Sequence, residues 1–328
     1  MFDRLDPLDR RLLDEFQRDL PLVPRPFAEI AATLCIDEAE TIVRLEALKA
    51  RGTIARVGAT VRPNTAGAST LAAMAAPSDR VDEVAAIVGA EEGVNHSYLR
   101  EDEVNLWFVV TAPDAASLTA SLERIEARTG FRVLDLRLVR PFNIDLGFRL
   151  GSGDRRKTSE ARTAQSAILQ AGDREILQAL SSGLPLVQRP FAALASSLAR
   201  TEEAVLSRIA TLDKAGILTR IGVIVRHRAI GWSANAMVVW NLPESRIDAA
   251  GPRLARQPGV TLCYQRRTVP GVWDFSLYSM IHARSRAEAL AYLDKAAALP
   301  ELAGVDHRAL FSVRCFKQTG ALLKATAA

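Results

Sequence analysis

The chain has 328 residues, which is too long for one typical domain, so we expect roughly two to four compact units. Its 48% hydrophobic and 24% charged residues are ordinary for a globular protein, and no stretch approaches the roughly eighteen apolar residues of a membrane span. A formal net charge of +4 is mild and does not by itself assign a function.

The first half opens with three short amphipathic helical patterns followed by an extended run. The patterns cover residues 8–16, 27–34 and 37–49, and Gly52 is a natural C-terminal stop for the third. The run at residues 54–61 looks like the strand pair of a winged helix-turn-helix.

The rest of the first half reads as strand, helix, strand, strand, helix and strand. This order and these loop lengths are typical of a ferredoxin-like split βαβ plait. The six elements are expected at residues 68–76, 79–90, 93–101, 104–111, 114–129 and 132–139.

The second half repeats this plan. Leu20-Pro-Leu-Val-Pro-Arg-Pro-Phe27 recurs as Leu184-Pro-Leu-Val-Gln-Arg-Pro-Phe191, and Arg56-Val-Gly58 recurs as Arg220-Ile-Gly222, in both cases 164 residues later. The repeat predicts a tandem duplication with insertions in its second half. The repeated elements are expected at residues 173–180, 191–198, 202–214, 217–225, 233–241, 244–257, 259–267, 274–282, 285–298 and 304–313.

The predicted fold class is therefore α+β, a duplicated winged helix-turn-helix plus split βαβ plait. Two helices cover only one face of each plait sheet, so we expect the two plaits to meet as an internal pseudo-dimer. The segment around residues 151–159 is small and polar, as a flexible connector would be. The predicted domains are winged helix-turn-helix 1–62, plait 63–148, linker 149–164, winged helix-turn-helix 165–228 and plait 229–328.

The chain carries no sign of secretion or of a disulfide framework. Its start, Met1-Phe-Asp-Arg-Leu-Asp, lacks the basic and then apolar layout of a signal peptide, so a cytoplasmic location is expected. The cysteines Cys35, Cys263 and Cys315 are odd in number and far apart, which argues against disulfides and against a structural zinc site. No metal site is expected. Most basic residues are arginine, which suits an anionic ligand but also fits a GC-rich coding bias.

Two versions of one motif are the candidate functional site. They lie at residues 93–100 with 105–109, and at residues 259–267 with 273–282. Alternation along a strand places every second side chain on one sheet face. These side chains are His96, Tyr98 and Arg100 in the first copy, and Leu262, Tyr264 and Arg266 in the second. The second copy regains a histidine on its next strand, where His282 corresponds to Thr111 of the first copy.

A winged helix-turn-helix followed by this plait resembles the Lrp/AsnC family of transcription regulators, and the chain more closely resembles the siroheme decarboxylases. The resemblance spans nearly the whole chain, as a fusion of the two subunit types of that family. The motifs that carry it are Val94-Asn-His-Ser-Tyr-Leu-Arg-Glu101, Val104-Asn-Leu-Trp-Phe-Val109, Arg226-His-Arg228, Ala234-Asn-Ala-Met-Val-Val-Trp240, Cys263-Tyr-Gln-Arg-Arg267, Met280-Ile-His282 and Leu310-Phe-Ser-Val-Arg-Cys-Phe-Lys-Gln318.

The resemblance implies a carboxy-lyase that removes carbon dioxide from the acetate side chains on C12 and C18 of siroheme. The product would be 12,18-didecarboxysiroheme, and the fused form looks like the heme d1 biosynthesis type. No cofactor is expected beyond the iron of the substrate, because the conjugated macrocycle can itself accept electrons. The implied partners are siroheme, as the substrate, and the other enzymes of heme d1 biosynthesis. Neither nucleic acid nor a membrane is expected, and a homo-oligomer beyond the internal pseudo-dimer is left open.

The resemblance also gives each candidate residue a role, and each role has a structural alternative. His96 and His282 are the candidate general acids, because imidazole titrates near neutral pH, or they are satisfied structural histidines. Arginine can clamp carboxylates or bridge the two halves, and aromatic rings can wall a ligand or pack a core. The carboxylate clamps would be Arg100, Arg266 and Arg267, the orienting phenols Tyr98 and Tyr264, the apolar walls Trp107, Trp273 and Tyr278, and further substrate contacts Arg226 and His227.

A DNA-binding regulator is the main alternative function, and a non-catalytic haem sensor is another. The predicted recognition helices begin with carboxylates, which repel DNA phosphates. These carboxylates are Asp37, Glu38 and Glu40 in one half and Glu202 and Glu203 in the other, with Arg44 and Arg208 as isolated compensations.

Overall fold

The computed structural model describes residues 2–144, 147, 150 and 164–323, and these form two compact units. The first unit combines residues 1–66 with 147–231, and the second combines 67–146 with 232–328. Each unit therefore contains one segment from each half of the duplication. The predicted linker at 149–164 lies almost entirely outside the described residues, and the predicted domain boundaries stay a prediction.

The first unit contains the helices of both helix-turn-helix segments, and the predicted helical patterns are confirmed. The second helix of each segment begins at a proline, whose fixed φ suits the first helical position. Side-chain oxygens of Asp6 and Thr201 cap two other helices by accepting backbone N–H groups. The helices are α1 (Pro7–Glu15), α2 (Pro26–Leu34), α3 (Glu38–Ala50), α6 (Asp173–Ser182), α7 (Pro190–Ser197) and α8 (Glu202–Lys214).

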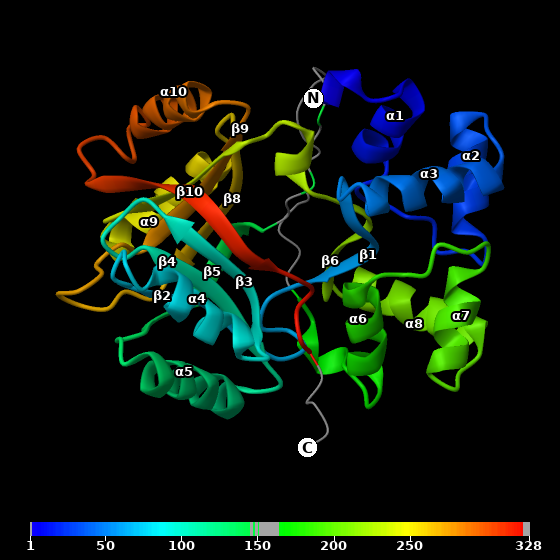
Figure 1. Cartoon of the computed structure of the whole chain (residues 1–328), viewed down its shortest axis with the longest axis horizontal. Helices are drawn as coiled ribbons and strands as arrows, with labels where there is room; N and C mark the ends of the chain where they lie inside the picture. Colours follow the sequence, from blue (N-terminus) through cyan, green and yellow to red (C-terminus); the bar gives the residue numbers. More distant parts are fainter. Residues whose placement is uncertain (1, 145–146, 148–149, 151–163, 324–328) are drawn as a thin grey trace. The chain divides into compact units, whose positions relative to one another are not determined.

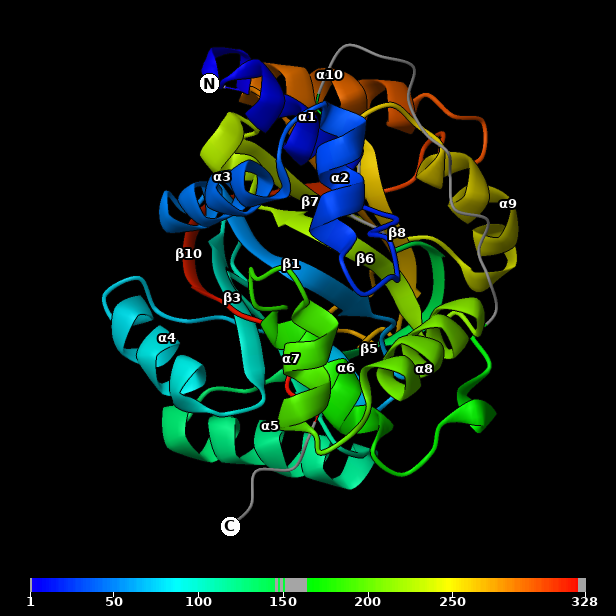
Figure 2. The same cartoon turned by 90° about the vertical axis from the view of Figure 1, so that its right-hand side faces the viewer.

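The expected strand pair after each third helix is wrong in one respect. Each run forms a single strand, β1 (Ile54–Val61) or β6 (Leu218–Val225), and the two strands pair with each other in antiparallel register. Figure 2 shows β1 and β6 side by side, with α1–α3 on one side of them and α6–α8 on the other. The duplication supplies the partner that a local hairpin would otherwise have provided.

Two glycines face each other at the centre of this strand pair, Gly58 opposite Gly222. A Cβ on Gly58 would lie 2.3 Å from the carbonyl oxygen of Leu180, and one on Gly222 would lie 2.5 Å from that of Phe16. Only glycine lets each strand approach the end of the first helix of the other half this closely. The two helix-turn-helix segments are therefore interlocked.

The second unit is a closed eight-stranded barrel with four helices on its outside (Figure 1). The observed elements agree with the strand and helix order predicted for both plaits. In the first plait they are β2 (Ala68–Met74), α4 (Val81–Ala90), β3 (Val94–Arg100), β4 (Leu106–Ala112), α5 (Ala115–Thr129) and β5 (Leu134–Asn143). In the second plait they are β7 (Ala234–Trp240), α9 (Glu244–Ala255), β8 (Val260–Arg266), β9 (Leu277–Ala283), α10 (Arg286–Ala297) and β10 (His307–Gln318). Short 3-10 turns lie at Phe2–Arg4, Ser166–Ile168 and His227–Ile230.

The last strand of each plait joins the two plaits into the barrel. β5 pairs first with β2 of its own plait and then with β8 of the other. β10 pairs first with β7 and then with β3. Figure 1 shows β10 and β3 side by side. Both strands extend several residues beyond the predicted ends. The predicted internal pseudo-dimer is confirmed.

Alternation along the strands divides their side chains between three cores. One face of each plait packs against its own helices, and the opposite faces share a core inside the barrel. This inner core includes Trp107, Trp273 and Tyr278, which are 2% exposed or less. None of the helices in the described part of the chain is long and apolar enough to cross a membrane.

Candidate functional site

The strand register places His282 and Thr111 at equivalent positions of the two plaits. Val110 pairs with Val94, and Ile281 pairs with Val260 in the same way. The residue after each of these partners, Thr111 or His282, therefore occupies the same place near the end of its strand. The correspondence predicted from the sequence is confirmed.

His282 lies in a chain of hydrogen bonds that joins four strands, β3, β7, β8 and β9. Its Nε2 is 2.7 Å from Nδ2 of Asn235 on β7, and its Nδ1 is 2.7 Å from Oγ1 of Thr261 on β8. Thr261 donates its hydroxyl hydrogen to the carbonyl oxygen of Met280, 3.1 Å away. At the other end, Nη1 of Arg100 donates to Oδ1 of Asn235 at 3.4 Å. The plait pseudo-dimer therefore places an arginine of one copy beside the histidine of the other.

The donors and acceptors in this chain fix the protonation of His282. Arginine can only donate, so Asn235 presents its oxygen to Arg100 and its amide nitrogen to the imidazole. The hydroxyl of Thr261 donates elsewhere, so it accepts from Nδ1. Burial, and then the charge of Arg100, lower the pKa of His282 to about 4. His282 is therefore neutral, with its hydrogen on Nδ1.

This lowered pKa gives the fold a pH dependence that can be measured. The contribution of neutral His282 to stability is fully present above its usual pKa of 6.5 and is lost as the pH falls through about 4. The size is at most about 3 kcal/mol, since one pKa unit corresponds to roughly 1.4 kcal/mol. Urea unfolding at several pH values should show wild type losing this much more stability than His282→Gln. Parallel pH profiles for the two proteins would contradict the assignment.

His96 belongs to a corresponding polar cluster in the first plait. Its Nδ1 donates to Oδ1 of Asn95 at 2.6 Å, and Asn95 donates from Nδ2 to Thr111 at 3.2 Å. The ring of His96 stacks on Tyr98 with centroids 6.2 Å apart, and the guanidinium of Arg100 lies over the same phenol at 5.6 Å. The predicted alignment of these three side chains on one strand face is confirmed.

Arg100 and Arg266 make equivalent contacts with the neighbouring strand at the two seams between the plaits. Nη1 of Arg100 donates to the carbonyl oxygen of Leu310 at 3.0 Å, and Nη1 of Arg266 donates to that of Leu136 at 2.7 Å. Both arginines therefore bridge the two plaits, as the structural alternative expects. Within the described residues, the buried Nε of each arginine has no hydrogen-bond partner. A carboxylate arriving at either group would find one unused N–H.

The other predicted substrate contacts lie in different surroundings. Tyr264 is buried in the inner core and stacks on Tyr278 with centroids 6.0 Å apart. Arg267 is exposed just beyond the end of β8, where its backbone N–H donates to Arg137. Arg226 and His227 belong to the first unit rather than to the barrel.

The three predicted aromatic walls are packed core side chains in this structure. Trp107 and Trp273 meet edge to face with centroids 5.3 Å apart, and Trp273 donates from Nε1 to the hydroxyl of Tyr278 at 2.8 Å. All three are 2% exposed or less, which favours packing over ligand contact. The middle of the barrel is therefore filled. The partly buried side chains of His96, Tyr98, Asn235 and His282 lie outside this packed core.

Asn235 and Thr261 are site residues that the sequence reasoning missed. Asn235 interrupts an otherwise apolar strand, and Ser69 occupies the equivalent position of the first plait. Comparing the two copies at this position could have found Asn235. A polar amide among apolar strand residues does not improve packing, so its presence indicates a hydrogen-bond partner.

A separate groove of about 570 Å³ lies on the first plait, against α5 and the start of β5. None of the predicted site residues lines it. Its lining combines three carboxylates, Glu123, Glu126 and Asp135, with Arg132 and Arg137, so it offers no excess of positive charge to a polyanionic ligand. Among the described residues, no group of three or more His, Cys, Asp or Glu side chains could hold a metal ion.

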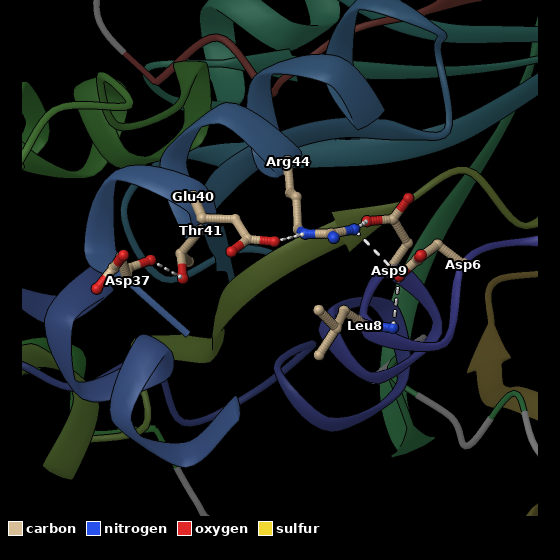
Figure 3. A network of polar contacts seen from close by, with 7 residues as sticks. All are labelled: Asp6, Leu8, Asp9, Asp37, Glu40, Thr41 and Arg44. Carbon is tan, nitrogen blue, oxygen red and sulfur yellow. Dashed lines mark hydrogen bonds and ion pairs between the residues drawn. The ribbon is translucent and has the colours of Figure 1, made fainter. Parts of the chain in front are cut away.

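The arginines of the two recognition helices are engaged inside the first unit. Arg44 forms ion pairs with Asp6, Asp9 and Glu40 at 2.9–3.1 Å (Figure 3). Arg208 likewise pairs with Asp173 at 2.6 Å, and this hydrogen bond raises the pKa of Arg208. The predicted compensating charges are therefore neutralised by carboxylates and are not presented to phosphates.

Two family models match the chain. One is described as the AsnC-like ligand binding domain and matches residues 66–142 and 229–317. The other is described as the siroheme decarboxylase NirDL-like HTH domain and matches residues 9–54 and 173–218. Each model matches twice, once in each half of the duplication.

Known proteins resemble the chain over its whole length and in halves. The siroheme decarboxylase NirDL subunit of Paracoccus denitrificans (strain Pd 1222) is 62% identical over 99% of both chains. The siroheme decarboxylase NirD and NirL subunits of Stutzerimonas stutzeri match 45% and 44% of this chain, covering 97% and 86% of their own, at 46% and 38% identity. They support the view that two subunit types are fused here.

Two solved structures are also similar. The crystal structure of the siroheme decarboxylase NirDL has a TM-score of 0.68 at 28% identity, covering 96% of this chain and 93% of that one. A crystal structure of a siroheme decarboxylase NirDL in co-complex with an iron-uroporphyrin III analogue has a TM-score of 0.67 at 27% identity, covering 96% of this chain and 92% of that one. With full-length identity, both family models and the barrel in agreement, the chain belongs to the siroheme decarboxylase family.

Proposed function

We propose that this chain removes carbon dioxide from the C12 and C18 acetate side chains of siroheme and yields 12,18-didecarboxysiroheme for heme d1 biosynthesis. The observation that carries the proposal is the 62% identity over 99% of the chain to a siroheme decarboxylase NirDL subunit. The paired histidine clusters in the barrel supply the chemistry that this reaction needs.

Each decarboxylation breaks one C–C bond and forms one C–H bond. The electron pair left by carbon dioxide enters the conjugated macrocycle of the substrate, so we propose no further cofactor. The carbon then takes a proton, for which His96 and His282 are the proposed donors. Arg100 and Arg266 are the proposed carboxylate contacts through their unused Nε groups, with Tyr98 orienting the carboxylate or a water. The roles of Tyr264, Arg267, Arg226 and His227 stay predictions.

Direct turnover tests the proposal. Anaerobic incubation of the purified chain with siroheme, followed by mass spectrometry, should yield a product that has lost two carbon dioxide units. The Paracoccus denitrificans relative provides the active control. Unchanged siroheme beside an active control would refute the decarboxylase.

A DNA-binding function has less support. Arg44 and Arg208 are held in ion pairs, and Arg25 and Arg189 pair with Glu38 and Glu202 at the starts of the recognition helices. These ion pairs neutralise arginine charges that would otherwise be available for non-specific DNA binding. We therefore propose siroheme, as the substrate, and the other enzymes of heme d1 biosynthesis as partners. We propose a cytoplasmic location, with neither nucleic acid nor membrane contact. A further homo-oligomer would extend the internal pseudo-dimer.

A further inference from the structure

We propose that Asn235 is a positioning residue that couples carboxylate binding at Arg100 to the protonation of His282. In the unliganded chain it holds His282 neutral, and on substrate binding it turns to support the imidazolium. The inference rests on the proposed function, because it concerns how His282, the proposed general acid, gains its proton.

The first step of the argument is the orientation of the Asn235 amide. Its oxygen faces Nη1 of Arg100 at 3.4 Å, and its nitrogen faces Nε2 of His282 at 2.7 Å. Turning the amide over would place its N–H groups against the arginine, which can only donate. Arg100 therefore keeps Asn235 in the orientation that donates to the histidine.

The second step is what this orientation does to His282. A proton on Nε2 would point at the Asn235 amide, so two donors would face each other at hydrogen-bond distance. The other ring nitrogen, Nδ1, already carries a hydrogen that it donates to Thr261, so it cannot take up the second proton of an imidazolium. Among the described residues, Arg100 from β3 acts on the charge of His282, and the phenols Tyr98 and Tyr264 act on that of Arg100. The neutral imidazole is thus favoured from both sides.

The third step is how the substrate releases this restraint. The contact from Arg100 to Asn235 is the longest of the chain, and the same Nη1 also donates to Leu310 at 3.0 Å. A carboxylate of the substrate at the unused Nε of Arg100 adds negative charge beside this contact and draws the guanidinium toward itself. Asn235 can then present its oxygen to Nε2, and His282 takes a proton from solvent. His282 is therefore protonated only when a substrate carboxylate is bound at Arg100.

The test is the pKa of His282 measured by NMR on histidine-labelled protein. The chain has only four histidines, so replacing each in turn assigns the signals. In wild type, His282 should be an Nδ1–H tautomer with a pKa near 4. Asn235→Asp gives Nε2–H a carboxylate acceptor and should raise this pKa by about two or more. Ser69→Ala, at the equivalent position of the first plait, should leave it unchanged.

A ligand titration gives a second arm that does not need the Asp variant to fold. Iron-free uroporphyrin, which carries acetate side chains, should raise the pKa of His282 in wild type and raise it much less in Asn235→Leu. A pKa near 6.5 in the unliganded wild type, or the same pKa with and without uroporphyrin, would overturn the coupling. Neither readout depends on turnover. A chain that decarboxylates siroheme without these shifts refutes the coupling alone, and one that shows them without decarboxylation refutes the proposed function alone.

Discussion

Replacing His282 with glutamine is expected to lower the rate of siroheme decarboxylation by about 10²–10⁴-fold, the usual contribution of a positioned general acid. Glutamine keeps hydrogen-bonding groups beside Asn235 and Thr261 but cannot deliver a proton at neutral pH. Siroheme affinity should change much less than turnover. Single-turnover kinetics by mass spectrometry, with binding followed by absorbance, separates the two effects.

The matched variants are His96→Gln and His307→Gln. His96 occupies the corresponding cluster of the first plait, so its variant should also lose activity. His307 stacks on Trp240 away from both clusters, so its variant should keep full turnover. If each cluster serves one acetate, His96→Gln and His282→Gln should each accumulate a product that has lost a single carbon dioxide. Full activity in both would end the proposed acid roles.

The helices and most strands were predictable because their signals are local. Helical periodicity ending at Gly52, and alternation through His96, Tyr98 and Arg100, depend only on neighbouring residues. The strand-switching ends of β5 and β10 were not, because their partners lie in the other half of the chain. The same reason applies to β1, because its partner β6 lies in the other half and a local pattern indicates only a local strand pair.

The site was predictable only where the two copies could be compared. His282 emerged as the counterpart of Thr111, and the structure places it so. The arginine contacts did not emerge, because a backbone carbonyl such as that of Leu310 leaves no mark in a sequence. Asn235 was missed for a related reason: its contacts join β3, β7 and β9, which are far apart in the chain.

The second large effect concerns the barrel core, where Trp273→Ala is expected to destabilise the fold by about 3–5 kcal/mol. Trp273 comes from the loop between β8 and β9, which is longer than its counterpart between β3 and β4. Its ring fills the inner core against Trp107 and Phe275, and its Nε1 donates to the buried hydroxyl of Tyr278. Truncation would leave both a cavity and an unsatisfied phenol.

Urea unfolding followed by circular dichroism measures this loss, and two variants control it. Val272→Ala changes the neighbouring residue, whose side chain is 47% exposed, and should shift stability by no more than about 0.5 kcal/mol. Trp273→Phe keeps a ring but removes the donor to Tyr278, so it should fall between the two. If Trp273→Ala were as stable as Val272→Ala, the ring would not be part of the core. The middle of the barrel would then have room for a ligand, and Trp107, Trp273 and Tyr278 would return as candidate walls of the siroheme site.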